Sequence, residues 1–306
     1  MRILFFGIFE RPYDTEVYIA NTLESLGHEV IRKNRTLTTD KMLAELLKGE
    51  YDFILLSKGW FCGDQQVVDK LLKDCKTLKV GWFFDLVIGT RREERMLKHQ
   101  SFKADIVCTT DGGQDERWKE LGINHKTLRQ GIYEPEAYMV DTQIENDIVF
   151  VGGSEHDYWF HWTHRADLLR WLKGTYGTRF KWLGQHDGIR NDELNRLYAS
   201  TKIVVGDSVY APNYWSNRLY ETIGRGGFLI FPMVEGLEKE FIPYKHFIPY
   251  TPYDWDGLKE KIDYYLTHDK EREEIRKAGF EHCKKYHTYT KRCEELIEIV
   301  NEHKRA

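Results

Sequence analysis

Long hydrophobic runs are missing from this sequence. The opening MRILFFGIFERPYD contains only a short apolar run before a glycine and charged residues. That run is too short for the core of a signal peptide or for a membrane span. We therefore expect the protein to stay in the cytoplasm.

Cysteine is scarce and is not arranged in pairs. The chain has five cysteines, an odd number, and no CxxC spacing, which disfavours both a disulfide framework and a zinc site. We expect all of them to be reduced thiols: Cys62, Cys75, Cys108, Cys283 and Cys293.

Excess charge of either sign is also lacking. The formal net charge is -4, so no global field would gather nucleic acid or anionic lipid, and only a local basic groove remains open. Charged residues make up 31% and hydrophobic residues 41% of the chain, as in ordinary soluble globular proteins.

With 306 residues, the chain exceeds what a single core usually supports, which favours two domains. Short apolar runs alternate with amphipathic segments through residue 122, and a second such series begins near residue 147. This alternation is typical of βα units around a parallel sheet. The stretch 133–147 between the two series is polar and contains Pro135, so we place the domain junction there.

The predicted fold is therefore α/β, with two successive doubly wound, Rossmann-like domains. The predicted domains are 1–141 and 142–289, both Rossmann-like, followed by a C-terminal helix over 290–306.

Ligands of doubly wound sheets bind beyond the carboxyl ends of the strands. Gly152, Gly153 and Ser154 directly follow the apolar run IVFV. Glycines in such a turn let the backbone approach a diphosphate, and the following helix N-terminus adds positive potential. Paired glycines are also common in turns that bind nothing.

The segment SVYAPNYWSNRLYETIGRGGFLIFP, residues 208–232, contains Arg218 and Glu221 three residues apart, near one face of a helix start. A carboxylate in that place can accept hydrogen bonds from two ribose hydroxyls, and a guanidinium can grip phosphate oxygens. The alternative is an ordinary i,i+3 salt bridge on a surface helix.

The run SNRLYETIGRGGFLIFP, with KIVVGDS before it and EGLEKEF after it, resembles the C-terminal domain of group 1 glycosyltransferases (glycosyltransferase family 4-like), especially the CgeB-like spore-maturation branch. The closing segment with His287, Thr288 and Tyr289 is similar to the last helices of that branch. The resemblance covers roughly residues 145 to 300 and is weaker in the first half.

This resemblance implies a GT-B fold, in which two Rossmann-like domains face each other across a cleft and the last helix packs back on the first domain. It also implies a nucleoside-diphosphate sugar donor, expected to be a UDP-sugar, with no metal and no other cofactor. The acceptor is then expected on domain 1–141 and the donor on domain 142–289. Glu221 matches the carboxylate that holds the donor ribose, and Arg218 matches the arginine of the SxRxxE-like pattern. Many retaining relatives carry another glutamate eight residues before the ribose carboxylate, where this chain has Asn213.

The complete set of predicted donor-binding residues consists of Gly152, Gly153, Ser154, His164, Arg165, Asn213, Asn217, Arg218 and Glu221. Arg218 is also predicted to be catalytic, because it would stabilise the charge of the departing diphosphate.

Asp85 follows the apolar run KVGWFF and is the second predicted catalytic residue, as a general base for an acceptor hydroxyl. The alternatives are a helix cap or an ion pair with Arg91 or Arg92. His156, His161 and His164 lie close in sequence, but no carboxylate or cysteine completes a recognisable ligand set, so no metal site is predicted.

By analogy with group 1 relatives, the expected reaction is transfer of a sugar with retention at the anomeric carbon. The acceptor is open among small molecules, glycans, proteins and modified nucleic acid bases. Two other readings remain: a nucleotide-sugar-binding scaffold with little or no activity, favoured by Asn213, and a sugar-nucleotide epimerase of the same architecture.

Overall fold

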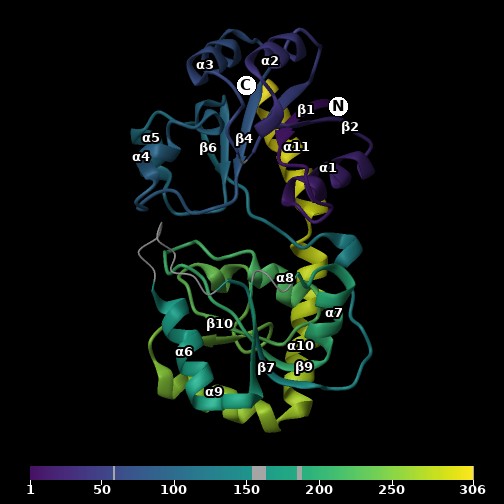
Figure 1. Ribbon diagram of the computed structural model, residues 1–306, viewed down its shortest axis with the longest axis vertical. Coiled ribbons are helices and arrows are strands. Elements are labelled where there is room, and N and C mark those ends of the chain that lie inside the picture. Colours follow the sequence, from purple (N-terminus) through teal and green to yellow (C-terminus); the bar gives the residue numbers. More distant parts are fainter. Residues whose placement is uncertain (58, 154–162, 185–187, 306) are drawn as a thin grey trace. The chain divides into compact units, whose positions relative to one another are not determined.

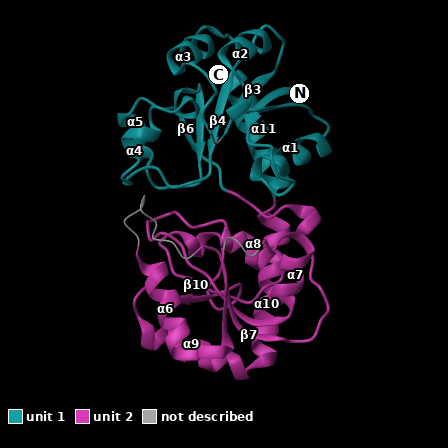
Figure 2. Ribbon diagram, in the orientation of Figure 1, with its two compact units in different colours: residues 1–129, 289–306 teal, residues 130–288 magenta. Residues whose placement is uncertain are grey.

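The computed structural model describes residues 1–57, 59–153, 163–184 and 188–305. The chain forms two compact units (Figure 2). Unit 1 comprises Met1–Arg129 and Tyr289–Ala306, and unit 2 comprises Gln130–Thr288.

Unit 1 is built on a six-stranded parallel sheet with the order β2-β1-β3-β4-β5-β6 (Figure 1). Its strands are β1 (Arg2–Gly7), β2 (Glu29–Asn34), β3 (Phe53–Leu56), β4 (Lys79–Phe83), β5 (Ile106–Thr109) and β6 (His125–Thr127). Its helices are α1 (Thr15–Ser25), α2 (Asp40–Leu46), α3 (Gln65–Asp74), α4 (Glu93–Met96), α5 (Asp115–Glu120) and α11 (Tyr289–Arg305), with short 3-10 turns η1 (Arg35–Leu37) and η2 (Gln100–Lys103).

Unit 2 contains a five-stranded parallel sheet with the order β11-β10-β9-β7-β8. Its strands are β7 (Asn146–Val151), β8 (Phe180–Leu183), β9 (Thr201–Val205), β10 (Leu229–Pro232) and β11 (Ile248–Tyr250). Its helices are α6 (His164–Tyr176), α7 (Asn191–Ala199), α8 (Arg218–Gly224), α9 (Trp255–Thr267) and α10 (Asp269–Tyr286), with 3-10 turns η3 (Glu134–Glu136), η4 (Gly177–Arg179) and η5 (Leu237–Lys239).

Helices cover both faces of the unit 2 sheet (Figure 1). Apolar side chains of α6 and α9 pack on one face, and those of α7 and α8, together with Cys283 of α10, pack on the other. Strands buried on both faces read as continuous apolar runs, which is why IVFV and FLIF are uniformly hydrophobic. The expected fold class, two parallel Rossmann-like sheets in succession, is confirmed.

The chain passes between the units twice, and the unit 2 residues at the two passages are hydrogen-bonded. The Ile132 N–H donates to the His287 carbonyl at 2.9 Å, and Ile132 forms a parallel bridge with Thr288. A side chain on Gly131 would come within 2.7 Å of the Thr288 carbonyl carbon, so only glycine fits there. Unit 2 thus begins at Gln130, ahead of the polar stretch that marked the junction in the sequence.

The last helix, α11, is part of unit 1. The Cys293 thiol lies 3.9 Å from the Ile19 carbonyl, and the ring of Tyr289 lies 6.3 Å from that of Tyr18 on α1. Leu296 and Val300 are fully buried along the same helix. The C-terminal segment therefore packs on α1, although it follows all of unit 2 in the sequence.

The charged segment RREERMLKHQ, residues 91–100, contains residues of high helical propensity, but only a short part of it is helical. Residues 91–100 form only the single turn α4, followed by η2. The Arg92 guanidinium donates to the Leu86 carbonyl at 3.0 Å, and the buried His99 caps η2 by accepting from the Ser101 N–H at 3.2 Å. These tertiary contacts outweigh the helical propensity of the segment.

Candidate functional site

The carboxyl edge of the unit 2 sheet brings together segments far apart in the sequence. β7 and β9 are neighbouring parallel strands. Gly152 follows β7, and Asp207 follows β9 after Gly206. Helices α6 and α8 begin with His164 and Arg218, whose side chains reach the ends of these strands. In doubly wound folds this edge is where ligands bind.

Asp207 is the buried centre of this arrangement. Its side chain has no exposed surface, and its carboxylate lies 2.9 Å from His164 Nδ1 and 3.0 Å from Arg165 Nε. The Ser216 hydroxyl donates to the Asp207 main-chain carbonyl at 2.9 Å. A buried carboxylate is stable only when paired and hydrogen-bonded, as it is here. Asp207 thereby fixes the first turn of α6 against the end of β9.

Aromatic rings pack against the His164 imidazole. Its imidazole stacks on Trp255 with ring centres 5.5 Å apart, and the Tyr253 ring is nearly perpendicular to it with ring centres 5.0 Å apart. His164 is fully buried. Of the three clustered histidines, His156 and His161 lie outside the described residues. Within the described part of the chain, no group of three His, Cys, Asp or Glu side chains is arranged to hold a metal ion.

Arg218 lies along the end of β7. Its Nε donates to the Val151 carbonyl at 3.2 Å, and its guanidinium lies 5.8 Å from the centre of the Phe150 ring. A Cβ on Gly152 would come within 2.5 Å of Arg218 Nη2, and Gly152 has a φ of 138°. Because Gly152 has no Cβ, the Arg218 side chain can pass over the loop at this position.

The surroundings of Arg218 favour an anion. Burial, and next the positive charge of Arg165, lower the pKa of Arg218 to about 10, while Asp207 opposes that shift. Among the described residues no carboxylate lies within ion-pair distance of Arg218, and its terminal nitrogens have no protein acceptor. A partly desolvated guanidinium in that state is stabilised by a bound anion.

Asn217 and Glu221 form a second polar pair, at the start of α8. Asn217 Nδ2 donates to Glu221 Oε1 at 3.2 Å, and the Asn217 Oδ1 atom is buried with no hydrogen-bond partner. The alternative of a surface salt bridge between Arg218 and Glu221 is not realised, because Arg218 turns to Val151 instead. The pair offers oxygen acceptors of the kind that bind ribose hydroxyls.

The glycine loop is tied to the neighbouring strand. The Gly152 N–H donates to the Leu183 carbonyl at 2.8 Å, and the indole N–H of Trp182 donates to the Gly152 carbonyl at 2.8 Å. The Gly152 N–H is thus already hydrogen-bonded within the sheet. The backbone donor of this loop that a diphosphate would contact is the N–H of Gly153. Ser154, the third residue predicted for this loop, lies outside the described residues.

Two other predicted residues, Asn213 and Asp85, have local partners of their own. Asn213 has a left-handed backbone, with a φ of 56°, and its N–H donates to the Glu235 carbonyl at 2.8 Å. Its side chain lies against Gly236, in the loop after β10. Asp85 belongs to unit 1, where it forms an ion pair with Arg92 at 3.2 Å, the alternative that the sequence left open.

Sequence reasoning did not select Asp207 as a site residue. The available signal was its place directly after the buried run KIVVG, at a strand end where ligands of this fold class bind. That position alone does not reveal that the carboxylate joins two residues more than forty positions away.

Two general expectations, reduced cysteines and no membrane-spanning helix, can be compared with the structure. All five cysteines are free thiols. None of the helices in the described residues is long and apolar enough to cross a membrane. A cavity of about 650 Å³ beside α3 in unit 1 is lined by four lysines, of which Lys79 and Lys103 are paired with Asp105 and Asp69.

Comparisons with known proteins identify a glycosyltransferase-like segment and proteins of similar fold. Residues 164–298 match a family model described as "Glycosyl transferase-like". A sequence comparison with curated proteins finds no match.

Among solved structures, the chain is similar to an alpha-glucosyltransferase in complex with UDP-glucose and DNA containing an abasic site, with a TM-score of 0.73 and 12% identity over 98% of this chain and 99% of that one. It is similar to Anabaena Alr3699/HepE in complex with UDP and glucose, with a TM-score of 0.67 and 12% identity over 98% and 99% of the two chains. It is also similar to sucrose-phosphate synthase from Thermosynechococcus elongatus, with a TM-score of 0.68 and 14% identity over 98% of each chain. At such identities the likeness establishes the fold, which is that of GT-B glycosyltransferases. The chain thus has the two-domain GT-B fold, and its residues 164–298 are similar to the glycosyl transferase-like family.

Proposed function

We propose that this protein transfers a sugar from a nucleoside-diphosphate donor, a UDP-sugar, to an acceptor hydroxyl in the cytoplasm. The observation that carries the proposal is the pair Arg165 and Arg218 at the carboxyl edge of unit 2. Arg165 is neutralised by Asp207, whereas Arg218 has a carbonyl as its protein partner and keeps its terminal nitrogens for a ligand. A diphosphate beside Gly153 supplies the missing negative charge.

The proposed roles follow from the chemistry of glycosyl transfer. As the anomeric carbon becomes cationic, charge develops on the leaving diphosphate, and preorganised donors that meet this charge lower the barrier most. The Arg218 guanidinium and the Gly153 amide are the proposed donors. Glu221 and Asn217 are proposed to accept hydrogen bonds from the ribose hydroxyls.

Metal independence and retention of configuration are part of the proposal. Guanidinium and amide groups can stabilise a leaving diphosphate without a metal ion. Retention rests on analogy with group 1 glycosyltransferases. Placement in the CgeB-like branch rests on the runs SNRLYETIGRGGFLIFP and HTY, the latter at His287, Thr288 and Tyr289.

The donor and acceptor classes are supported by the fold relatives. Two of these structures are complexes with UDP and glucose or with UDP-glucose, which favours a UDP-hexose. One of them contains DNA as well, which keeps a modified base among the acceptor candidates beside small molecules, glycans and proteins. In unit 1, Asp85 remains the proposed base for the acceptor hydroxyl, once that hydroxyl displaces Arg92 from the carboxylate.

A non-catalytic nucleotide-sugar-binding scaffold is the second candidate. The observation that favours it is Asn213, which stands where retaining relatives carry a glutamate and whose side chain lies against Gly236. Such a protein would bind UDP-sugars without turning them over. An epimerase would instead interconvert UDP-sugars without an acceptor.

A thermal-shift screen of the full chain tests the proposal. We expect UDP and UDP-glucose to raise the melting temperature more than GDP, ADP or dTDP do, because a ligand at a hundred times its dissociation constant adds about 2.7 kcal/mol of stability. Slow release of glucose from UDP-glucose would separate a transferase from a scaffold.

Two arginine variants make this test specific. Arg218→Ala should reduce the shift, because it removes charge-assisted hydrogen bonds to the diphosphate, whereas Arg170→Ala, on the exposed side of α6 and paired with Asp167, should keep it. If no nucleoside diphosphate shifts the wild-type protein, the assignment of the donor site is wrong.

A further inference from the structure

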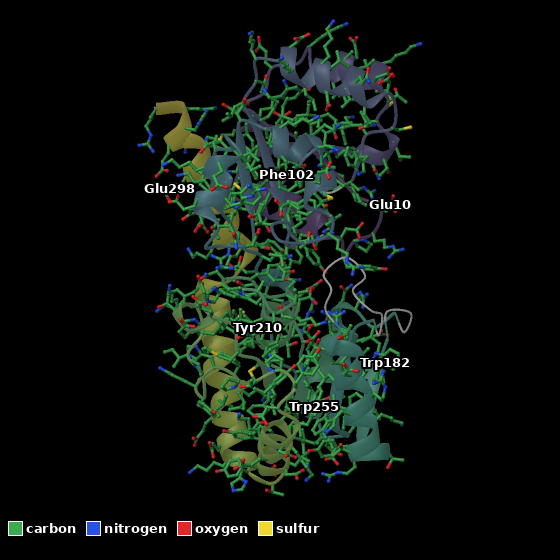
Figure 3. The ribbon with its side chains drawn as sticks, turned by 90° about the vertical axis from the view of Figure 1, so that its left-hand side faces the viewer. Glu10, Phe102, Trp182, Tyr210, Trp255 and Glu298 are labelled. Atoms are coloured by element: carbon green, nitrogen blue, oxygen red, sulfur yellow. The ribbon has the colours of Figure 1, made fainter. Side chains whose placement is uncertain are left out.

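The edge strand β8 contains, one residue before its end, a tryptophan that is hydrogen-bonded yet partly exposed to solvent. Trp182, labelled in Figure 3, is 45% exposed. Its strand neighbour on the same face, Phe180, is buried in the core beneath α6 and α9. A single exposed ring is common on protein surfaces. The indole of Trp182 is nevertheless oriented, because its N–H donates to the Gly152 carbonyl at 2.8 Å.

Two side chains hold consecutive carbonyls of the glycine loop. Arg218 of α8 donates to the Val151 carbonyl at 3.2 Å, and Trp182 of β8 donates to the Gly152 carbonyl at 2.8 Å. β7 lies between β9 and β8 in the sheet. The glycine loop therefore accepts one hydrogen bond from a guanidinium of α8 and another from an indole of β8.

These groups match the two chemically different ends of a nucleoside diphosphate. The anionic end requires guanidinium and amide donors, which Arg218 and Gly153 supply. The nucleobase end is a flat π-system that binds aromatic rings by stacking, in a manner tolerant of base identity. A ring that is already oriented loses less conformational entropy when the base binds.

We propose that Trp182 is the stacking platform for the nucleobase of the donor. This inference rests on the proposed function, since it assigns the base end of the same donor site. Stacking on Trp182 contributes affinity, while discrimination among bases comes from groups around the base edge. The donor sugar ring is the competing occupant of this surface, and the test below separates the two.

Calorimetry on the full chain with UDP, UDP-glucose and inorganic pyrophosphate tests this assignment. Trp182→Ala should weaken UDP binding by about tenfold or more, the effect expected when one base loses its aromatic platform. Pyrophosphate has no base, so its affinity should stay within about twofold of the wild-type value. Trp182→Phe, which keeps a ring but loses the N–H, should bind UDP within about fivefold of the wild-type protein.

Tyr264→Ala is the matched control. Tyr264 is 43% exposed, similar to Trp182, and lies near the far end of α9, where its hydroxyl donates to Glu271. This variant should bind UDP as the wild-type protein does. Thermal denaturation of each variant without ligand verifies that it is folded.

The possible outcomes are distinct. Equal UDP affinity for Trp182→Ala and wild type overturns the inference and leaves the donor site intact. Equal losses for UDP and pyrophosphate overturn it as well, because Trp182 would then act only by holding Gly152. A loss confined to UDP-glucose assigns the ring to the sugar instead. A wild-type protein that binds no UDP overturns the proposed function itself, and this inference with it.

Discussion

Replacing Gly152 with alanine tests the connection between the glycine loop and Arg218. The added Cβ would lie 2.5 Å from Arg218 Nη2, 3.0 Å from Nε and 3.1 Å from Cζ. These atoms belong to the end of a flexible side chain, so the expected response is displacement of the guanidinium from the loop. Position 152 also has a φ of 138°, a conformation that alanine rarely adopts.

The two effects have separate magnitudes. Backbone strain at such a position costs about 1–3 kcal/mol of folding stability. Removal of a guanidinium from a phosphate forfeits charge-assisted hydrogen bonds worth about 1.5–3 kcal/mol. That loss corresponds to a UDP affinity weaker by about 10- to 150-fold.

The assay is calorimetric titration of UDP, combined with chemical denaturation of the unliganded protein. The control is Gly174→Ala on α6, where a new Cβ would meet nothing within 4 Å. Alanine is the better helix former, so Gly174→Ala should raise stability by up to about 1 kcal/mol and leave UDP affinity unchanged.

A double-mutant cycle then isolates the contact. If Gly152→Ala acts by displacing Arg218, it should cause no further loss of UDP affinity, within about 0.5 kcal/mol, when Arg218 is already alanine. An equal loss in both backgrounds would refute the reasoning, as would wild-type affinity in the single variant.

Three further predictions concern other residues. Glu221→Gln should weaken UDP binding by about 1–3 kcal/mol without changing the melting temperature of the unliganded protein, and unchanged affinity in calorimetry would remove Glu221 from the ribose site. Arg218→Lys should reduce turnover of UDP-glucose more than UDP affinity, because a point charge replaces a planar fork; wild-type turnover would exclude leaving-group stabilisation by Arg218. Burial lowers the pKa of His125 to about 4, so the unfolded chain takes up a proton at this residue as the pH falls from about 6.5 to 4, and the folded protein loses stability in that window. His125→Phe, which retains a ring to stack on Trp118, should make the free energy of unfolding fall less between those pH values, and an unchanged slope would show that His125 is already protonated in the folded state.

The sequence by itself determined the class of fold and most of its elements. Apolar runs such as FILL and IVFV are uniformly hydrophobic because helices cover both faces of each parallel sheet. The position of Gly152 after a strand, and that of Arg218 and Glu221 at a helix start, could likewise be read from local pattern, since strand-to-helix turns at the carboxyl edge occupy predictable places.

The tertiary structure alone decided which side chains meet. Helix α8 begins at Arg218, because the preceding residues are bonded elsewhere: the Ser216 hydroxyl donates to the Asp207 carbonyl, and the Trp215 indole donates to the Tyr220 hydroxyl at 2.8 Å. Asp207 joins His164 and Arg165 across more than forty residues, and α11 returns to α1 after the whole of unit 2. Local pattern reports the face of a strand or helix that is buried, but it carries no information on the distant partner packed against that face. The position of Asp207 at the centre of the candidate site and the limits of the two units could therefore be determined only from the tertiary structure.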